Sequence, residues 1–215
     1  GERIRLHRRN AEALAAVPGL EVQHARLAYH WRAGGEPARA LPAAVAAARE
    51  AERLHGFAAA FEHWTGAVDL ARHVPVDQRG ELGPTPLGRW AAEAAHRCGE
   101  HGRGLVLADR LAAELGDPPS WLRTLRARLL AAVGRLTEAE AEYEATLAAE
   151  DVSAPERVAA AAQAADLLRQ LGRYAEAGKR AQDALDRARG VADCTSSVVL
   201  AGATLGYSQA FLDDH

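Results

Sequence analysis

The chain has 215 residues, a formal net charge of −3 and 48% hydrophobic residues, enough for a sizeable core in one or two domains. Alanine makes up about a quarter of the sequence and aromatic residues 5%, a composition that favours helix over sheet. A near-neutral chain lacks the basic excess of nucleic-acid-binding surfaces, so we expect no direct nucleic acid contact. No signal peptide and no apolar run of about 18 residues occurs, which argues against secretion and membrane insertion.

Cysteine and methionine usage adds two expectations. The two cysteines, Cys98 and Cys194, lie far apart, so a disulfide framework is not expected and a reducing cytoplasm is the predicted location. The sequence holds no methionine and begins at Gly1. We therefore expect residues 1–215 to be a single helical domain cut from a longer protein.

Hydrophobic periodicity predicts four helices before residue 74. They cover Arg3 to Val17, Leu20 to Ala33, Pro37 to Leu54 and Phe57 to His73, with turns at Pro18-Gly19, Gly34-Gly35 and His55-Gly56. Pro42 lies inside the third of these helices, where proline usually introduces a kink unless it falls in the first turn. Residues 74–86 contain three prolines and two glycines and have no period, so we expect one long loop there and a candidate bend.

The remainder of the chain is more regular. Helices are predicted at 87–98, 101–115, 119–133, 137–149, 155–171, 174–188 and 195–212, which gives about 10–11 helices in all. Asp117 and Ser153 precede two of these helices and are the residue types that cap helix N-termini.

A repeated sequence pattern runs through these helices. Gly99, Gly134 and Gly172 occupy the same place in successive units, 35 and 38 residues apart. After Gly172, an aromatic residue follows at +2 and alanines at +5 and +12. Glycine permits the turn between two helices, and small residues let the helices approach closely.

This sequence pattern resembles the second half of a tetratricopeptide (TPR) repeat, whose period is about 34 residues. The resemblance implies an all-α, right-handed superhelical solenoid of antiparallel helix pairs, with a concave face lined by the first helix of each pair. The 20-residue spacing from Gly35 to His55 departs from the family pattern, and implies that helix 37–54 is shared by two hairpins. The alternative is a set of generic antiparallel hairpins with an alanine-rich seam.

Counting from the repeat pattern places eleven side chains on the concave face. They are Tyr29, Arg32, Arg49, Glu52, Arg89, Glu93, His96, Arg128, Asp166, Arg169 and Tyr207. Mixed arginines and carboxylates suit a polar peptide or partner segment, because arginine can bind carboxylates in bidentate fashion. The alternative is a solvated face with ion pairs inside each helix, such as Arg49 with Glu52 and Asp166 with Arg169.

Three groups of residues could suggest other chemistry. His96, Cys98 and His101 resemble part of a zinc site, but a structural zinc needs four ligands and no second pair follows, so we expect Cys98 near the turn and both imidazoles facing water. His24 and His30 lie six residues apart, a poor spacing for ligation from one helix. Glu62-His63 could form a polar pocket, although an exposed helix face explains them as well. No phosphate loop, nucleophile elbow or helix-turn-helix occurs, so we expect neither catalysis nor a metal.

A more specific resemblance covers roughly residues 3–70. The segments are Arg5-Leu6-His7-Arg8-Arg9, the run from Leu27 to Ala40, and Ala47-Ala48-Arg49-Glu50-Ala51-Glu52-Arg53-Leu54. They look like the segment after the ATPase module in large ATP-binding LuxR-type bacterial transcriptional regulators and AfsR-like relatives. In that family a TPR-like domain senses an inducer or partner between an ATPase and a DNA-binding domain. ATP would belong to the parent protein, and no cofactor is expected in this chain.

The resemblance leads to a first hypothesis, a non-catalytic sensor domain of a transcriptional regulator. Its partners would be a protein, a peptide, a small inducer or neighbouring domains of the parent chain, with a dimer as a further option. The alternative is a free-standing TPR scaffold or adaptor. A third hypothesis, an enzyme that uses His96, Cys98 and His101, would require stoichiometric zinc.

Overall fold

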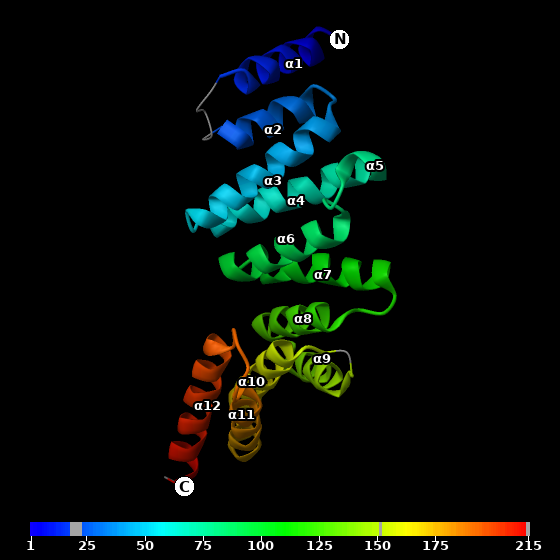
Figure 1. The fold of residues 1–215 in the computed structure, drawn as a ribbon. Coiled ribbons are helices and arrows are strands. Elements are labelled where there is room, and N and C mark those ends of the chain that lie inside the picture. The colour runs from blue at the N-terminus through cyan, green and yellow to red at the C-terminus, as the bar shows by residue number, and fades with distance from the viewer. Residues whose placement is uncertain (18–22, 151, 214–215) are drawn as a thin grey trace. The chain divides into compact units, whose positions relative to one another are not determined.

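A computed structural model describes residues 1–17, 23–150 and 152–213. Within these ranges the chain forms twelve helices and no strand (Figure 1). The all-α prediction is therefore confirmed. The structure has one helix more than the eleven predicted ranges, because α5, Val76–Arg79, was not anticipated. The predicted turn at Pro18-Gly19 and the first residues of the helix predicted from Leu20 lie outside the described residues.

The helices divide into two compact units, Gly1–Leu111 and Ala112–His215, which we describe separately. Unit 1 contains α1 (Glu2–Ala15), α2 (His24–Ala33), α3 (Pro37–Arg53), α4 (Phe57–His73), α5, α6 (Pro84–Cys98) and most of α7 (His101–Leu115). Helix α3 packs against both α2 and α4, as expected for a helix shared by two hairpins, and α4 packs against α6. A single domain over 1–215 stays a prediction.

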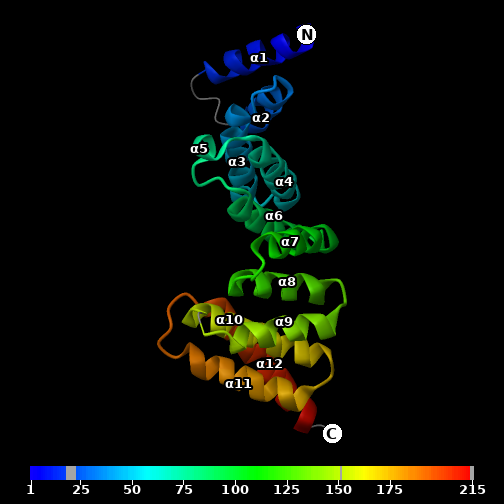
Figure 2. The ribbon, with the colours of Figure 1, turned by 90° about the vertical axis from the view of Figure 1, so that its right-hand side faces the viewer.

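Unit 2 is built around α10. It contains α8 (Ser120–Ala132), α9 (Leu136–Ala148), α10 (Ala154–Gln170), α11 (Tyr174–Ala188) and α12 (Thr195–Asp213). Helices α8 and α9 form one pair and α10 and α11 the next, while α10 also contacts α8, α9 and α12 (Figure 2). The first helices of successive pairs, α8, α10 and α12, therefore lie beside one another.

The glycines that set the repeat period end their helices in the left-handed conformation. Gly99, Gly134 and Gly172 have φ angles of +83°, +83° and +75°. After each one, the next N–H donates to a carbonyl five residues earlier over 2.9 Å, the bond that closes a helix C-terminus. His55 takes the same place with φ of +58°, although its Cβ makes this conformation costly.

The residues at +5 and +12 from each turn form the seams between paired helices. All are buried: Ala40 and Ala47, Ala60 and Ala67, Gly104 and Leu111, Ala139 and Thr146, Ala177 and Ala184. Thr146 fits among the alanines because its hydroxyl donates to the Glu142 carbonyl at 2.9 Å, so no polar atom is left unpaired. The sequence pattern therefore identified the packing seams correctly.

Two local predictions need correction. Residues 74–86 are not one loop, because α5 forms and α6 starts at Pro84, where a proline at the first helical positions lacks an N–H that would be unpaired anyway. The helix predicted from Pro37 to Leu54 does form, and α3 continues through Pro42. Helix α1 buries only Ala11 and leaves Ile4 and Leu6 exposed.

The second correction concerns the caps. Pro119 is the N-cap residue of α8, and Asp117 instead accepts a hydrogen bond from Arg123 at 2.8 Å. Ser153 does cap α10, in a capping box with Glu156. One of the two predicted caps is therefore confirmed and the other is wrong.

Candidate functional site

In unit 2 the fold brings three of the predicted residues together on the face formed by α8, α10 and α12. Arg169 Nε donates to Asp166 Oδ1 at 2.8 Å, one helical turn away. The Arg169 guanidinium also lies 5.2 Å from the centre of the Tyr207 ring, a cation–π contact from α10 to α12. The predicted ion pair inside α10 is therefore confirmed, and Tyr207 as a whole remains half-exposed.

Arg128 of α8, the fourth predicted residue in unit 2, lies near a buried tyrosine. Tyr143 of α9 is 3% exposed, and its hydroxyl donates to Gln163 Oε1 at 3.1 Å. Burial raises the pKa of Tyr143; the charge of Arg128 opposes the rise and Asp166 adds to it. The phenol therefore stays protonated, and both charged groups lie close enough to influence it. We define the α8/α10/α12 face by Arg128, Asp166, Arg169 and Tyr207.

Arg128 differs from Arg169, the other arginine of this face. Within the described part of the chain its half-buried guanidinium donates no hydrogen bond and forms no ion pair. Sequence reasoning missed Tyr143 and Gln163. Tyr143 belongs to α9, the second helix of its pair, so counting along first helices does not reach it, and Gln163 of α10 is identified only as its hydrogen-bond partner.

In unit 1 the predicted residues of α3 and α6 lie around two tryptophans. Glu52 accepts a hydrogen bond from Trp64 Nε1 at 3.2 Å, and the Arg49 guanidinium lies 5.6 Å from the Trp90 ring centre. The suggested Arg49–Glu52 ion pair is not formed among the described residues, because both partners bind indoles instead. Arg89 and Glu93 pair along α6 at 2.9 Å.

Tyr29 and Arg32 lie elsewhere in unit 1. They line a cavity between α2 and α4 together with Glu62 and His63. Glu62 and His63 therefore border a hollow, but it is lined mainly by small apolar residues and is not the polar pocket considered from the sequence. Its other wall is α2, a partner that helical spacing within α4 could not reveal.

The histidine clusters do not form a metal site. The His96 and His101 rings contact one another, with centroids 5.3 Å apart and their Nδ1 atoms buried, so the expectation that both imidazoles face water was wrong. Cys98 donates to the Ala95 carbonyl, near the turn as expected. Over the residues that the structure describes, no group of three or more potential ligands could hold a metal ion.

His24 and His30 also bind separate partners. His24 Nδ1 lies 3.3 Å from Glu50 Oε2, and His30 Nδ1 lies 2.9 Å from His7 Nδ1 of α1. The two imidazoles therefore fasten α2 to different helices and form no common site.

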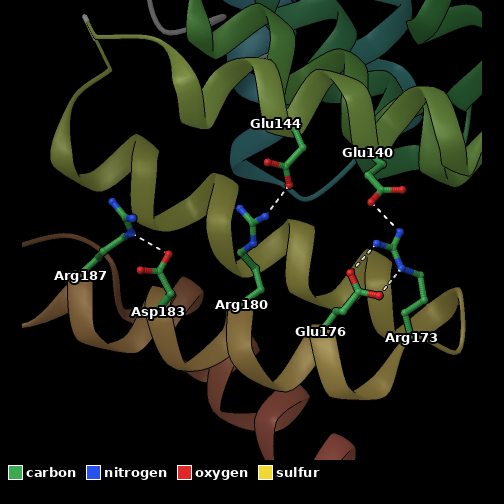
Figure 3. Close-up of polar contacts among 7 residues, drawn as sticks. All are labelled: Glu140, Glu144, Arg173, Glu176, Arg180, Asp183 and Arg187. Atoms are coloured by element: carbon green, nitrogen blue, oxygen red, sulfur yellow. Dashed lines mark hydrogen bonds and ion pairs between the residues drawn. The ribbon is translucent and has the colours of Figure 1, made fainter.

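A charged groove of about 500 Å³ runs between α9 and α11. Arg173 binds Glu140 and Glu176, both at 2.6 Å, and Arg180 binds Glu144 at 2.6 Å (Figure 3). These charges satisfy one another across and along the helices. The ion pairs therefore join α9 to α11, and Lys179 is the lining cation that forms no ion pair with a described residue.

No helix among the described residues is long and apolar enough to cross a membrane. No family model matches the chain, and no curated protein matches it. The fold is therefore compared through solved structures alone.

Three solved structures have the same fold. A thermophilic TPR protein from Thermus thermophilus matches with a TM-score of 0.56 and 20% identity, over 86% of this chain and 98% of that chain. TPR-like repeats of a kinesin light chain type from Podospora anserina match with a TM-score of 0.59 and 18% identity, over 82% and 93%. BtubC (BKLC) from P. vanneervenii matches with a TM-score of 0.58 and 16% identity, over 99% and 88%.

These likenesses establish a TPR-like solenoid of helix pairs. At 16–20% identity they concern the fold alone.

Proposed function

We propose that this chain is a non-catalytic interaction module, and that unit 2 captures a polar segment of a partner protein on the α8/α10/α12 face. The observation that carries the proposal is Arg128, a half-buried guanidinium without an acceptor among the described residues. A partially desolvated charge without a partner is unfavourable, and an incoming carboxylate or backbone carbonyl would relieve that penalty.

The neighbouring residues supply the rest of a recognition surface. Arg169 is held by Asp166 and lies against Tyr207, so the aromatic ring and the guanidinium form an ordered platform across α10 and α12. Ordered side chains lose little conformational entropy when a partner binds. A segment with one acidic residue for Arg128 and an aromatic or apolar residue for Tyr207 would suit this face.

A finer proposal places this module in a transcriptional regulator, as the sensor domain between an ATPase and a DNA-binding domain. It is supported by the resemblance of residues 3–70 to LuxR-type regulators. The residues that flank the chain in its native polypeptide test it. A phosphate-binding loop upstream and a helix-turn-helix downstream are expected. Flanks without either motif would leave a free-standing scaffold or adaptor.

The binding face is tested by charge reversal. Peptides selected from an acidic, aromatic-containing library on the whole chain would be titrated against Arg128→Glu and Arg169→Glu by fluorescence anisotropy. Each substitution should weaken binding about tenfold or more. Arg128→Glu replaces a charge-assisted hydrogen bond with repulsion, and Arg169→Glu removes the cation–π contact with Tyr207 and places a carboxylate beside Asp166.

Arg189→Glu is the matched control, since Arg189 carries an 80% exposed side chain at the end of α11, away from the face. Circular dichroism should show unchanged helix content in all three variants. Peptide affinity that is the same for Arg128→Glu, Arg169→Glu and the unsubstituted chain would refute the proposed face.

A further inference from the structure

A cavity of about 200 Å³ lies in unit 1 between α2 and α4, over Ala44 of α3. The side chains on α2 at 25, 28, 29 and 32 share one helical face, as do those on α4 at 62, 63, 66 and 70. Helix α3 packs against both α2 and α4. The cavity is thus built by three helices of one compact unit.

Small residues create this hollow. Ala28, Ala44 and Gly66 line it, and a Cβ added to Gly66 would meet no atom within 4 Å apart from its own helix. Glycine inside a helix is unfavourable compared with alanine. Gly66 therefore lies at a helical position that borders the cavity, where a larger side chain would occupy the open space.

The cavity lining holds one arginine, Arg32, and one carboxylate, Glu62. Within the described chain, the exposed Arg32 makes no hydrogen bond or ion pair. Glu62 accepts a hydrogen bond from Arg103 of α7 at 2.7 Å, so it already has a cationic partner. Arg32 is therefore the lining cation that is available to a ligand.

Two further polar groups border the hollow. His63 is half-buried and makes no hydrogen bond to a described residue, and burial lowers its pKa, although Glu62 opposes this. The imidazole is therefore neutral near pH 7 and can donate one hydrogen bond. Tyr29 lines the same wall as Arg32 and adds an aromatic surface and a hydroxyl.

We propose that this cavity binds a small organic carboxylic acid with one compact apolar or aromatic group. Arg32 would bind the carboxylate, with His63 as a second donor, and the apolar group would fill the space over Ala44 beside Gly66. The inference does not depend on the proposed partner face, which belongs to unit 2.

The size of the hollow limits the ligand. At about 30 Å³ per water, 200 Å³ corresponds to roughly six or seven water molecules. This volume is below the ~300–1,000 Å³ of sites for drug-sized ligands, so nucleotides and oligosaccharides are too large. The same chemistry occurs in a free aromatic acid and in the C-terminal residue of a peptide.

Phenylacetate is a suitable probe, and the peptide acetyl-Ala-Phe tests the second source. Either compound should shift the amide signals of Gly66 and Ala28 in two-dimensional NMR spectra of the whole chain at millimolar concentration. Binding of phenylacetate assigns the site to free acids, and binding of the peptide alone assigns it to a chain terminus. Phenylacetamide, which lacks the charge, should bind about tenfold more weakly or not at all.

Two substitutions test whether phenylacetate binding depends on this cavity and on its arginine. Gly66→Leu should fill the hollow and Arg32→Gln should remove the cation, and each should weaken phenylacetate binding about tenfold or more. Gly202→Leu is the matched control, because Gly202 is an exposed helical glycine of unit 2 with no atom near its added Cβ. Equal affinity for phenylacetamide, binding that survives Gly66→Leu, or no shift with either probe would overturn the proposal.

Discussion

Gly172 and Gly206 show how differently one residue type acts at two positions. Gly172 has φ of +75° and lets the chain turn from α10 into α11. Gly206 lies inside α12 and is exposed, and a Cβ there would meet no atom within 4 Å. Side chains strain the left-handed conformation but favour the helical one, so the same substitution should have opposite effects.

Gly172→Ala should therefore lower the free energy of unfolding by about 1 kcal/mol, and Gly206→Ala should raise it by up to ~1 kcal/mol. Urea unfolding followed by circular dichroism measures both. A stabilising effect at Gly172 would mean that the turn does not need the left-handed conformation.

At the scale of one element, the start of α10 is fixed by a reciprocal pair. Ser153 Oγ accepts from the Glu156 N–H at 3.4 Å, and the Ser153 N–H donates to the Glu156 carboxylate at 3.3 Å. Two N–H groups that would lack partners at the helix N-terminus are thereby satisfied. Asp117 makes only an exposed ion pair before α8.

Ser153→Ala should therefore destabilise the chain by about 1 kcal/mol, whereas Asp117→Ala should cost less than about 0.5 kcal/mol. The two substitutions form a matched pair for urea unfolding, since both residues were predicted caps. Equal losses would show that Asp117 caps α8 in solution.

The contact between α1 and α2 depends on protonation. His7 and His30 face each other at 2.9 Å, so one imidazole must donate and the other accept. Arg8 of α1 also donates to the Gly34 carbonyl and pairs with Glu36, and Tyr29 packs against His7. Burial lowers the pKa of His30, and the charges of His7 and Arg26 lower it further.

Because the folded pKa of His30 lies below the ordinary 6.5, the unfolded chain binds the proton first as the pH falls. The stabilisation is therefore complete above pH 6.5 and decreases as the pH falls below it. His63 shifts in the same direction. Thermal unfolding midpoints should fall on acidification, and His30→Gln should reduce that fall. The exposed His73→Gln is the control, and an unchanged pH dependence in His30→Gln would contradict this account.

At the scale of the whole molecule, charge is nearly balanced. The sequence has 26 basic and 29 acidic residues, and many arginines of both units are paired with carboxylates. Non-specific binding to DNA requires cations that can displace counterions from phosphates. We therefore expect no measurable binding of the chain to a labelled DNA duplex by anisotropy, even at low salt. Binding that weakens linearly with the logarithm of salt concentration would refute this expectation.

The α8/α10/α12 face was partly predictable from the sequence. Asp166 and Arg169 lie three residues apart, and helical spacing alone predicts their ion pair. Their contact with Tyr207 requires α12 to lie beside α10, which the repeat pattern implied. The assignment of Tyr29, Arg32 and Arg49 to one concave face stays a prediction. The cavity that Tyr29 and Arg32 line with α4 could not be predicted by counting, because counting does not show which neighbour each helix face meets.

Local sequence signals predicted every helix except α5, and they also predicted the seams between paired helices. Glycines with positive φ and small residues at fixed distances from them are local requirements, set by backbone sterics and by how closely two helices approach. Only the tertiary structure decided that Glu52 binds Trp64 and not Arg49, that Arg128 has no partner among the described residues, and that Gly66 and Ala28 line one cavity. These contacts join side chains from different helices. Their geometry depends on how successive helices pack, which no spacing within a single helix specifies.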